Sequence, residues 1–143
     1  MVRRMRIVID TNVFVASLSS HSPFHWLIEA LIDEVFDLYI STEVLLEYEE
    51  ILKQKYPYGV AENFIRSLNE LPNVHKVDIS YKWLLIIADP DDDKFVDLAV
   101  CAKADYLITN DKHFNVLKML PFPKIALLKL QEFEDLLEIK SNE

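Results

Sequence analysis

The sequence contains one glycine and one cysteine among its 143 residues. Glycine-rich phosphate loops need several glycines where the backbone approaches the ligand, so Gly59 alone excludes the Walker and dinucleotide-binding types. Cys101 alone cannot form an intrachain disulfide or a cysteine-cluster metal site, which fits a reducing, intracellular setting. Nucleotide binding through such a loop is therefore excluded, and so is a disulfide framework.

Long apolar runs are also absent. No apolar stretch reaches the roughly 18 residues of a membrane-spanning helix, and the segment that ends at Asp10 is too short for a signal peptide. Hydrophobic residues make up 51% of the chain, enough for one sizeable core. We therefore expect a single domain over residues 1–143, in the cytoplasm and without a membrane partner.

Basic residues are outnumbered, with 15 Lys and Arg against 24 Asp and Glu and a net charge of -9. Non-specific binding to nucleic acid depends on Lys and Arg replacing counterions, so this charge argues against a basic binding surface. A bound cation reverses the local sign and can itself hold a phosphate. The composition is thus compatible with a nuclease if several acids form a metal site.

Strand and helix patterns alternate along the chain. Short β-branched apolar segments predict strands, and apolar residues at helical spacing after capping residues predict helices. We expect strands at residues 5–9, 37–40, 74–79, 106–108 and 124–128, and helices starting at Ser22-Pro23 and spanning residues 42–55, 60–71, about 91–103 and 131–139. This order indicates an α/β fold with a largely parallel sheet, in which sites gather at the carboxyl ends of the strands.

Three acidic segments stand at informative places in this pattern. Asp10 follows the first strand, a run extends from Asp89 to Asp93, and Asp111 follows the strand at residues 106–108. At about 4 Å and an effective dielectric near 20, each like-charge pair costs roughly 4 kcal/mol. No basic residue lies inside the first or third segment to offset this cost, so converging carboxylates predict a divalent cation.

Each acid also has a simpler interpretation. Asp10 and Asp111 are good caps for short helices, and the run at residues 89–93 is typical of a solvated loop. Asp93 and Asp97 share one helix face, where they either meet solvent or share a cation. The residue types alone leave these alternatives open.

Four motifs in order resemble a known family. They are Ile9-Asp10-Thr11-Asn12, Ser41 opening a helix that carries Glu47, the segment Asp91-Asp92-Asp93-Lys94-Phe95-x-Asp97-x-Ala99, and the segment from Ala104 to Lys112. Together they look like the signature of PIN-domain ribonucleases, in particular the VapC-like toxins of type II toxin–antitoxin systems. The resemblance extends from about Met5 to Phe133 and implies a three-layer α/β/α PIN-like fold with a central, mostly parallel five-stranded sheet.

The resemblance also implies a site. The catalytic, metal-binding acids are Asp10, Glu47, Asp93 and Asp111, with Asp97 as a fifth ligand, while Asp89, Asp91 and Asp92 are expected to be loop and cap residues. These oxygen ligands suit one or two Mg²⁺ or Mn²⁺ ions. Asn12, Ser41 and Thr109 are expected to support the ligands, and Lys94, Lys112 and His113 to contact phosphates.

Two positions in this site are ambiguous. Glu47 and Glu49 lie about equally far from the centre of the apolar face of their helix, so only the resemblance favours Glu47. Asn110 stands where the subgroup commonly has glycine, which leaves the tightness of that turn open.

The expected function is Mg²⁺- or Mn²⁺-dependent endoribonuclease activity on RNA phosphodiester bonds, by a homodimeric toxin that a small antitoxin protein neutralises. Two other functions compete with it. A haloacid-dehalogenase-like phosphatase also has Asp after its first strand, but it needs a second Asp where Asn12 stands. A PIN-like module without catalysis would bind a partner and no divalent ion.

Overall fold

A parallel five-stranded sheet organises the chain in the computed structural model, which describes residues 3–86 and 90–141. The strands are β1 (Met5–Ile9), β2 (Phe36–Ile40), β3 (Val74–Lys76), β4 (Tyr106–Ile108) and β5 (Leu127–Leu128), in the order β3-β2-β1-β4-β5. All four strand pairings are parallel. The predicted α/β class is confirmed, and the sheet is parallel throughout.

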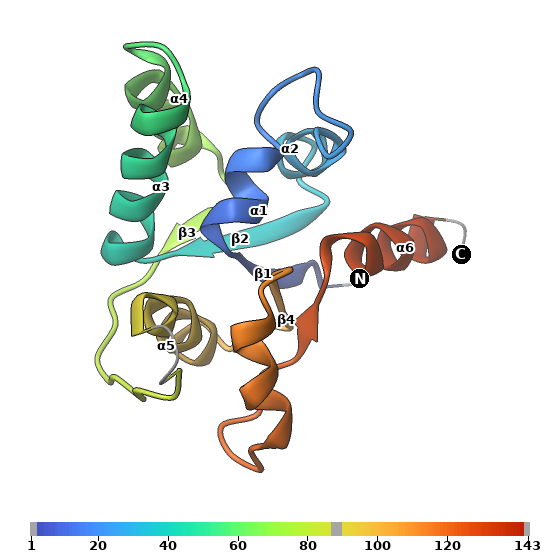
Figure 1. Cartoon of the computed structure of the whole chain (residues 1–143). Helices are drawn as coiled ribbons and strands as arrows, with labels where there is room; N and C mark the ends of the chain where they lie inside the picture. The colour runs from blue at the N-terminus through green and yellow to red at the C-terminus, as the bar shows by residue number, and fades with distance from the viewer. Residues whose placement is uncertain (1–2, 87–89, 142–143) are drawn as a thin grey trace.

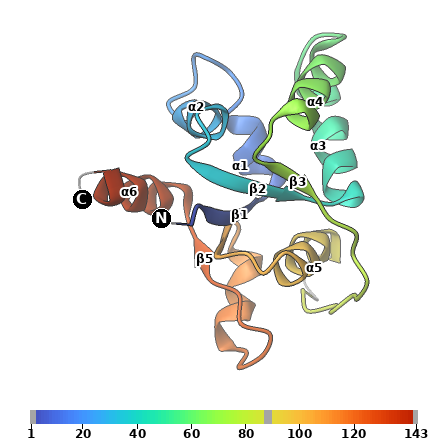
Figure 2. The ribbon, with the colours of Figure 1, turned by 180° about the vertical axis from the view of Figure 1, so that it is seen from behind.

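Helices cover both faces of the sheet (Figure 1). One face carries α1 (Thr11–Ala16), α2 (Trp26–Ile32), α3 (Thr42–Lys55) and α4 (Val60–Glu70), and the other carries α5 (Asp93–Cys101) and the 3₁₀ helix η2 (Lys112–Met119). The view from behind shows the same division (Figure 2). The three layers predicted from the resemblance are therefore confirmed.

The last helix, α6 (Leu130–Ser141), closes the core beside α2. The ring of Phe133 packs against Trp26 of α2 and Phe36 of β2, with centroid distances of 6.2 and 5.4 Å. None of the helices in the described part of the chain is long and apolar enough to cross a membrane.

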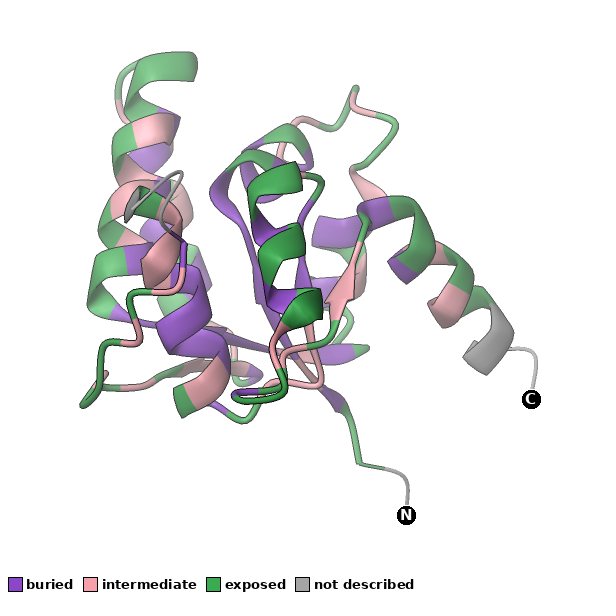
Figure 3. Ribbon diagram, turned by 60° about the horizontal axis from the view of Figure 1, so that its bottom comes forward, coloured by how far each residue is buried: buried purple, intermediate pink, exposed green. Residues whose placement is uncertain are grey.

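The centre of the core is β1, whose Ile7, Val8 and Ile9 are all buried. Neighbouring strands bond it on both edges, and helices cover it above and below, so the strand is a continuous apolar run. Figure 3 shows this buried layer running through the sheet and the inward faces of the helices. The polar residues that follow β1 and β4 in sequence therefore emerge at one edge of a rigid core.

Several element boundaries differ from the sequence-based expectation, and the strand expected at residues 124–128 covers only Leu127–Leu128. The helix predicted at Ser22-Pro23 begins only at Trp26, because Ser22 Oγ instead accepts the N–H of Phe24 in a preceding turn. The strand predicted to reach residue 79 ends at Lys76, and Val77 N makes the next bond to Ile40 O. Beyond it, the backbone N–H groups of Trp83 and Ile86 bond to the carboxylates of Asp97 and Asp93 on α5.

Candidate metal centre

Asp10 and Asp111 lie at the same edge of the sheet because the strands that they follow are paired. Ile9 lies opposite Ile108 in the parallel ladder, and Asp10 N donates to Ile108 O at 3.0 Å. The loop after β4 then reaches Asp111. The expectation that these two acids converge therefore agrees with the topology.

A shared hydroxyl group fixes the two acids. Thr109 Oγ1 donates to Asp10 Oδ2 and accepts the backbone N–H of Asp111 at 3.0 Å. Asp10 is 6% exposed and Thr109 4% exposed. The carboxylate of Asp10 and the backbone of Asp111 are thus positioned before any ligand binds.

Both acids are also helix caps. Asp10 Oδ1 accepts the N–H of Val13 at the start of α1, and Asp111 Oδ1 accepts the N–H of His113 at the start of η2. The capping interpretation from the sequence is confirmed for both residues. It does not compete with the functional one, since a carboxylate oxygen has a second lone pair for another partner.

Glu47 points into the same region from α3. Its Oε2 accepts the hydroxyl of Thr11, and its Oε1 forms an ion pair with Lys94 Nζ at 2.8 Å. Glu49 instead pairs with Lys53 at 3.3 Å on the outer side of the helix. The structure thus distinguishes the two glutamates, which the sequence pattern could not: Glu47 points toward the acids, and Glu49 does not.

Ser41 supports Glu47 indirectly. Its buried Oγ accepts the N–H of Val44 and caps α3, the helix that carries the glutamate. The cap expected from the sequence is confirmed.

These side chains line a cavity of about 200 Å³, which we call the acidic pocket. Its lining residues are Asp10, Thr11, Asn12, Glu47, Ile51, Asp91, Asp92, Phe95 and Asp111. Carboxylates from the ends of two strands, from α3 and from the 3₁₀ turn η1 (Pro90–Asp92) therefore meet in one place. Asp91 and Asp92 were not expected here, and Thr11 was missed as well.

The acids of the central run take different positions at the start of α5. Asp92 occupies the N-cap position, but its side chain makes no capping bond, and it faces the acidic pocket.

Asp93 and Asp97 do not line the acidic pocket. Asp93 Oδ1 accepts the Ile86 N–H at 2.7 Å, and Asp97 Oδ1 accepts the Trp83 N–H at 2.9 Å. Asp97 is 6% exposed, so the solvent-facing alternative is wrong for this residue. Asp89 lies outside the described residues.

Among the described residues, Asp92, Asp111 and His113 form a group of potential ligands, with one ligand atom of each lying within 4.8 Å of the others. His113 Nδ1 is 3.4 Å from Asp111 Oδ1 and 3.8 Å from Asp92 Oδ2. Carboxylate oxygens suit Mg²⁺ and Mn²⁺, and imidazole is a common ligand of other divalent metals such as Zn²⁺ and Fe²⁺. The donor set therefore fits a divalent cation.

Electrostatics at Asp10 favour a positive ligand. Burial raises the pKa of Asp10, and the charge of Asp111 adds to this effect. Hydrogen bonds from Thr109 and from the backbone N–H groups of Val13 and Asn12 lower the pKa in part. A nearby cation would favour the charged form that burial disfavours.

Tyr48 is buried next to the end of β1. Its buried hydroxyl donates to Ile9 O at the end of β1. Burial, with the charges of Asp10 and Glu47, holds its pKa well above the ordinary value. The phenol therefore stays neutral beside the acids.

Lysines gather on the other side of Asp111. Lys112, Lys118 and Lys129 line a neighbouring cavity of about 180 Å³ that also contains Asp111; we call it the lysine cleft. Lys94, in contrast, is paired with Glu47. Of the two lysines predicted to contact phosphates, the geometry therefore favours Lys112.

The turn at Asn110 does not need glycine. Asn110 is not among the described residues with positive φ. Its Oδ1 accepts Leu130 N at 3.2 Å and so ties the loop after β4 to the start of α6. The substitution is therefore compatible with the turn.

Comparisons with known proteins agree with this architecture. The family model described as PIN domain matches residues 6–113. Among curated protein sequences, none matches the chain.

Three solved structures have a similar fold. VapBC2 from Rickettsia felis, solved with a DNA fragment from its promoter, is 19% identical with a TM-score of 0.60, over 87% of this chain and 98% of the other. FitAcB from Neisseria gonorrhoeae is 17% identical with a TM-score of 0.57, over 87% and 98%. The PIN domain endonuclease Utp24 is 19% identical with a TM-score of 0.50, over 87% and 84%.

Proposed function

Because the chain belongs to the PIN domain family, we propose that it is a divalent-metal-dependent endoribonuclease that hydrolyses RNA phosphodiester bonds. One observation carries the proposal: carboxylates from four separate elements line a single pocket at the carboxyl edge of a parallel sheet. Such an edge is where α/β proteins place their sites.

Asp10, Asp92 and Asp111 are the acids that we propose as ligands, with Glu47 at the rim of the pocket. When bound, Mg²⁺ or Mn²⁺ supplies a water of lowered pKa and polarises the phosphate. Asp93 stays a prediction from the sequence, since its Oδ1 accepts the Ile86 N–H and the residue does not line the acidic pocket.

The protein's own groups prepare this site. Thr109 holds Asp10 and Asp111 in fixed orientations, and Lys94 balances the charge of Glu47. The lysine cleft beside Asp111 offers positive charge to phosphates that flank the reacting one. Three of the 15 basic residues of a chain of net charge -9 thus lie beside the acidic pocket.

The test is cleavage of single-stranded RNA by the purified protein in Mg²⁺ or Mn²⁺. We expect cleavage to stop in EDTA and in Asp10→Asn, while Asp33→Asn, at an exposed position at the end of α2, stays active. Full activity of the Asp10→Asn variant would contradict the proposed site.

We further propose that the protein is a toxin neutralised by a small antitoxin protein, and that it forms a homodimer in the cytoplasm. The motifs shared with VapC-like toxins support this role, as does the fold shared with VapBC2 and FitAcB. Induced expression in a bacterial host should arrest growth, and Asp10→Asn should relieve the arrest. Light scattering of the purified protein tests the dimer.

A further inference from the structure

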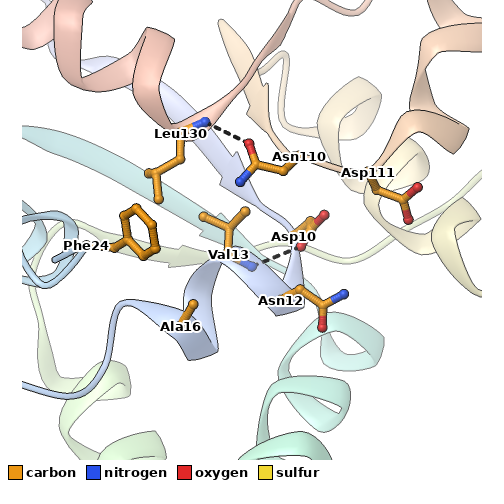
Figure 4. A pocket seen from close by; sticks show the side chains of 8 residues that line it. All are labelled: Asp10, Asn12, Val13, Ala16, Phe24, Asn110, Asp111 and Leu130. Atoms are coloured by element: carbon orange, nitrogen blue, oxygen red, sulfur yellow. Dashed lines mark hydrogen bonds between the residues drawn. The ribbon is translucent and has the colours of Figure 1, made fainter. Parts of the chain in front are cut away.

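A second cavity, of about 290 Å³, opens beside the acidic pocket, and its two ends differ in chemistry (Figure 4). We call it the amphipathic pocket. One end is polar and consists of Asp10, Asn12, Asn110 and Asp111; the other is apolar and consists of Val13, Ala16, Phe24 and Leu130. The two acids are shared with the acidic pocket, so the two cavities are adjacent at the candidate metal centre.

Phe24 forms the outer wall of the apolar end and is 42% exposed. Its backbone is held by Ser22 Oγ at 3.0 Å and by the bond from Leu27 N to Phe24 O. Within the described part of the chain no aromatic ring pairs with it, whereas Trp26 packs into the core against Phe133. The backbone of Phe24 is therefore held in place, and its partly exposed ring lines the apolar end of the pocket.

Asn110 supplies a directed donor on the opposite wall. Its Oδ1 faces Leu130 N, an N–H donor that requires an acceptor, so the Nδ2 group points the other way. Figure 4 shows this nitrogen directed into the pocket. No residue in the described ranges accepts a hydrogen bond from it, which leaves the donor available to a ligand.

We infer that the amphipathic pocket is a nucleobase subsite, which takes one unstacked base of single-stranded RNA next to the phosphate at the acidic end. A base has a flat face that stacks on an aromatic ring and a polar edge that accepts hydrogen bonds. In this subsite the base stacks on Phe24, and its polar edge accepts a hydrogen bond from Asn110 Nδ2. Bases inside a duplex are stacked on both sides and do not enter, so the substrate class is single-stranded.

This inference rests on the proposed function, because the acidic end places the phosphate only if the pocket acts on RNA. It extends the proposal by naming the determinant of substrate class.

The experiment compares a short oligouridylate with a matched oligomer that lacks the bases. KM for oligouridylate is measured by cleavage in Mn²⁺, and the inhibition constant of the base-free oligomer is measured by competition. For Phe24→Leu we expect KM to rise by roughly fivefold or more, since base–aromatic stacking is lost. The inhibition constant of the base-free oligomer should not change, and Phe24→Trp should restore the KM.

Tyr58→Ala is the matched control, because Tyr58 is also an exposed aromatic residue but lies in the turn between α3 and α4. It should leave both constants unchanged. An unchanged KM in Phe24→Leu overturns the subsite while the proposed function stands. An equal loss of affinity for both oligomers also overturns it, because Phe24 would then act only on local structure.

Failure of the proposed function gives a different result. If the wild-type protein cleaves no RNA, the affinity of labelled oligouridylate is measured directly by fluorescence anisotropy in Mn²⁺. Weaker binding by Phe24→Leu, with recovery in Phe24→Trp, then supports the subsite without the nuclease. Equal binding by all variants overturns it.

Discussion

Thr109 donates its hydroxyl hydrogen to Asp10 across two paired strands, and the same oxygen accepts the backbone N–H of Asp111. One buried side chain therefore sets the orientation of both acids at the end of the sheet. The arrangement depends on the hydroxyl group more than on the size of the residue, and this makes it testable by substitutions of similar volume.

Thr109→Val should lower activity by roughly 10- to 100-fold, as is typical when a group that orients a metal ligand is lost. It should also lower the free energy of unfolding by about 1–3 kcal/mol, because a buried acceptor and a partly buried N–H lose their partner. Thr109→Ser keeps the hydroxyl and should retain most of the activity. RNA cleavage and urea denaturation measure the two effects, and equal activity of the valine and serine variants would contradict the role.

Glu47→Gln and Glu49→Gln form a matched pair on α3. Glu47→Gln removes the charge that faces the acidic pocket, so cleavage should fall by roughly 10- to 100-fold. Glu49→Gln breaks only the surface pair with Lys53, which is worth about 1 kcal/mol or less, and should leave cleavage unchanged. Initial rates at saturating Mn²⁺ measure both. A loss of cleavage activity in Glu49→Gln alone would show that Glu49, and not Glu47, acts at the site.

Asp92→Asn and Asp93→Asn distinguish the ligand inferred from the structure from the one predicted from the sequence. A metal that binds only the folded state at 100 times its dissociation constant stabilises it by about 2.7 kcal/mol, so Mn²⁺ should raise the Tm of the wild-type protein. Asp92→Asn should abolish this rise. Asp93→Asn should keep the rise and lower the Tm in EDTA, since an amide oxygen is a weaker acceptor for Ile86 N–H.

The opposite pattern, with the Mn²⁺ effect lost in Asp93→Asn and kept in Asp92→Asn, would establish Asp93 as the ligand. Differential scanning fluorimetry with and without Mn²⁺ is sufficient to separate the two results.

Asp105 gives a pH dependence away from the site. Partial burial alone would raise its pKa, but the hydrogen bonds from Arg6 N–H and Arg3, with the charges of both arginines, lower it below its ordinary value. A lowered pKa means that the carboxylate stabilises the fold above its unfolded-state pKa, and that this contribution is lost as the pH falls through the folded-state pKa.

Asp105→Asn should therefore lower the free energy of unfolding by about 1 kcal/mol at pH 7, because the amide cannot accept both bonds. The difference from the wild-type protein should shrink below about pH 4. Glu50→Gln, at an exposed position, is the control and should show no such trend. A difference that stays constant from pH 7 to pH 3 would contradict the charge-based explanation.

The sequence was sufficient for the architecture because local signals agreed with one another. Apolar periodicity located the strands, and the predicted capping role of Ser41 is confirmed at the start of α3. The pairing of β1 with β4 then brings Asp10 and Asp111 together, as a parallel sheet requires.

The orientation of acids within helices was harder to predict. Successive residues of a helix differ by about 100° around its axis, so the boundary of α5 decides which of Asp91, Asp92 and Asp93 faces the pocket. That boundary depends on tertiary contacts, including the bond between Asp93 and Ile86 N, that no local pattern encodes. Phe24 lies in a turn, where periodicity does not predict the direction of a side chain.

The segment of residues 77–86 is fastened to α5 through the main-chain N–H groups of Trp83 and Ile86, while the carboxylates belong to the helix. Every residue except proline has such an N–H group. Related proteins are therefore free to vary the side chains at these two positions and still keep the path of the segment, provided that the helix retains its acids. Changes of side chain in this region would then say little about structural change. A proline at position 83 or 86 would be the exception, because it removes the N–H group that bonds to α5.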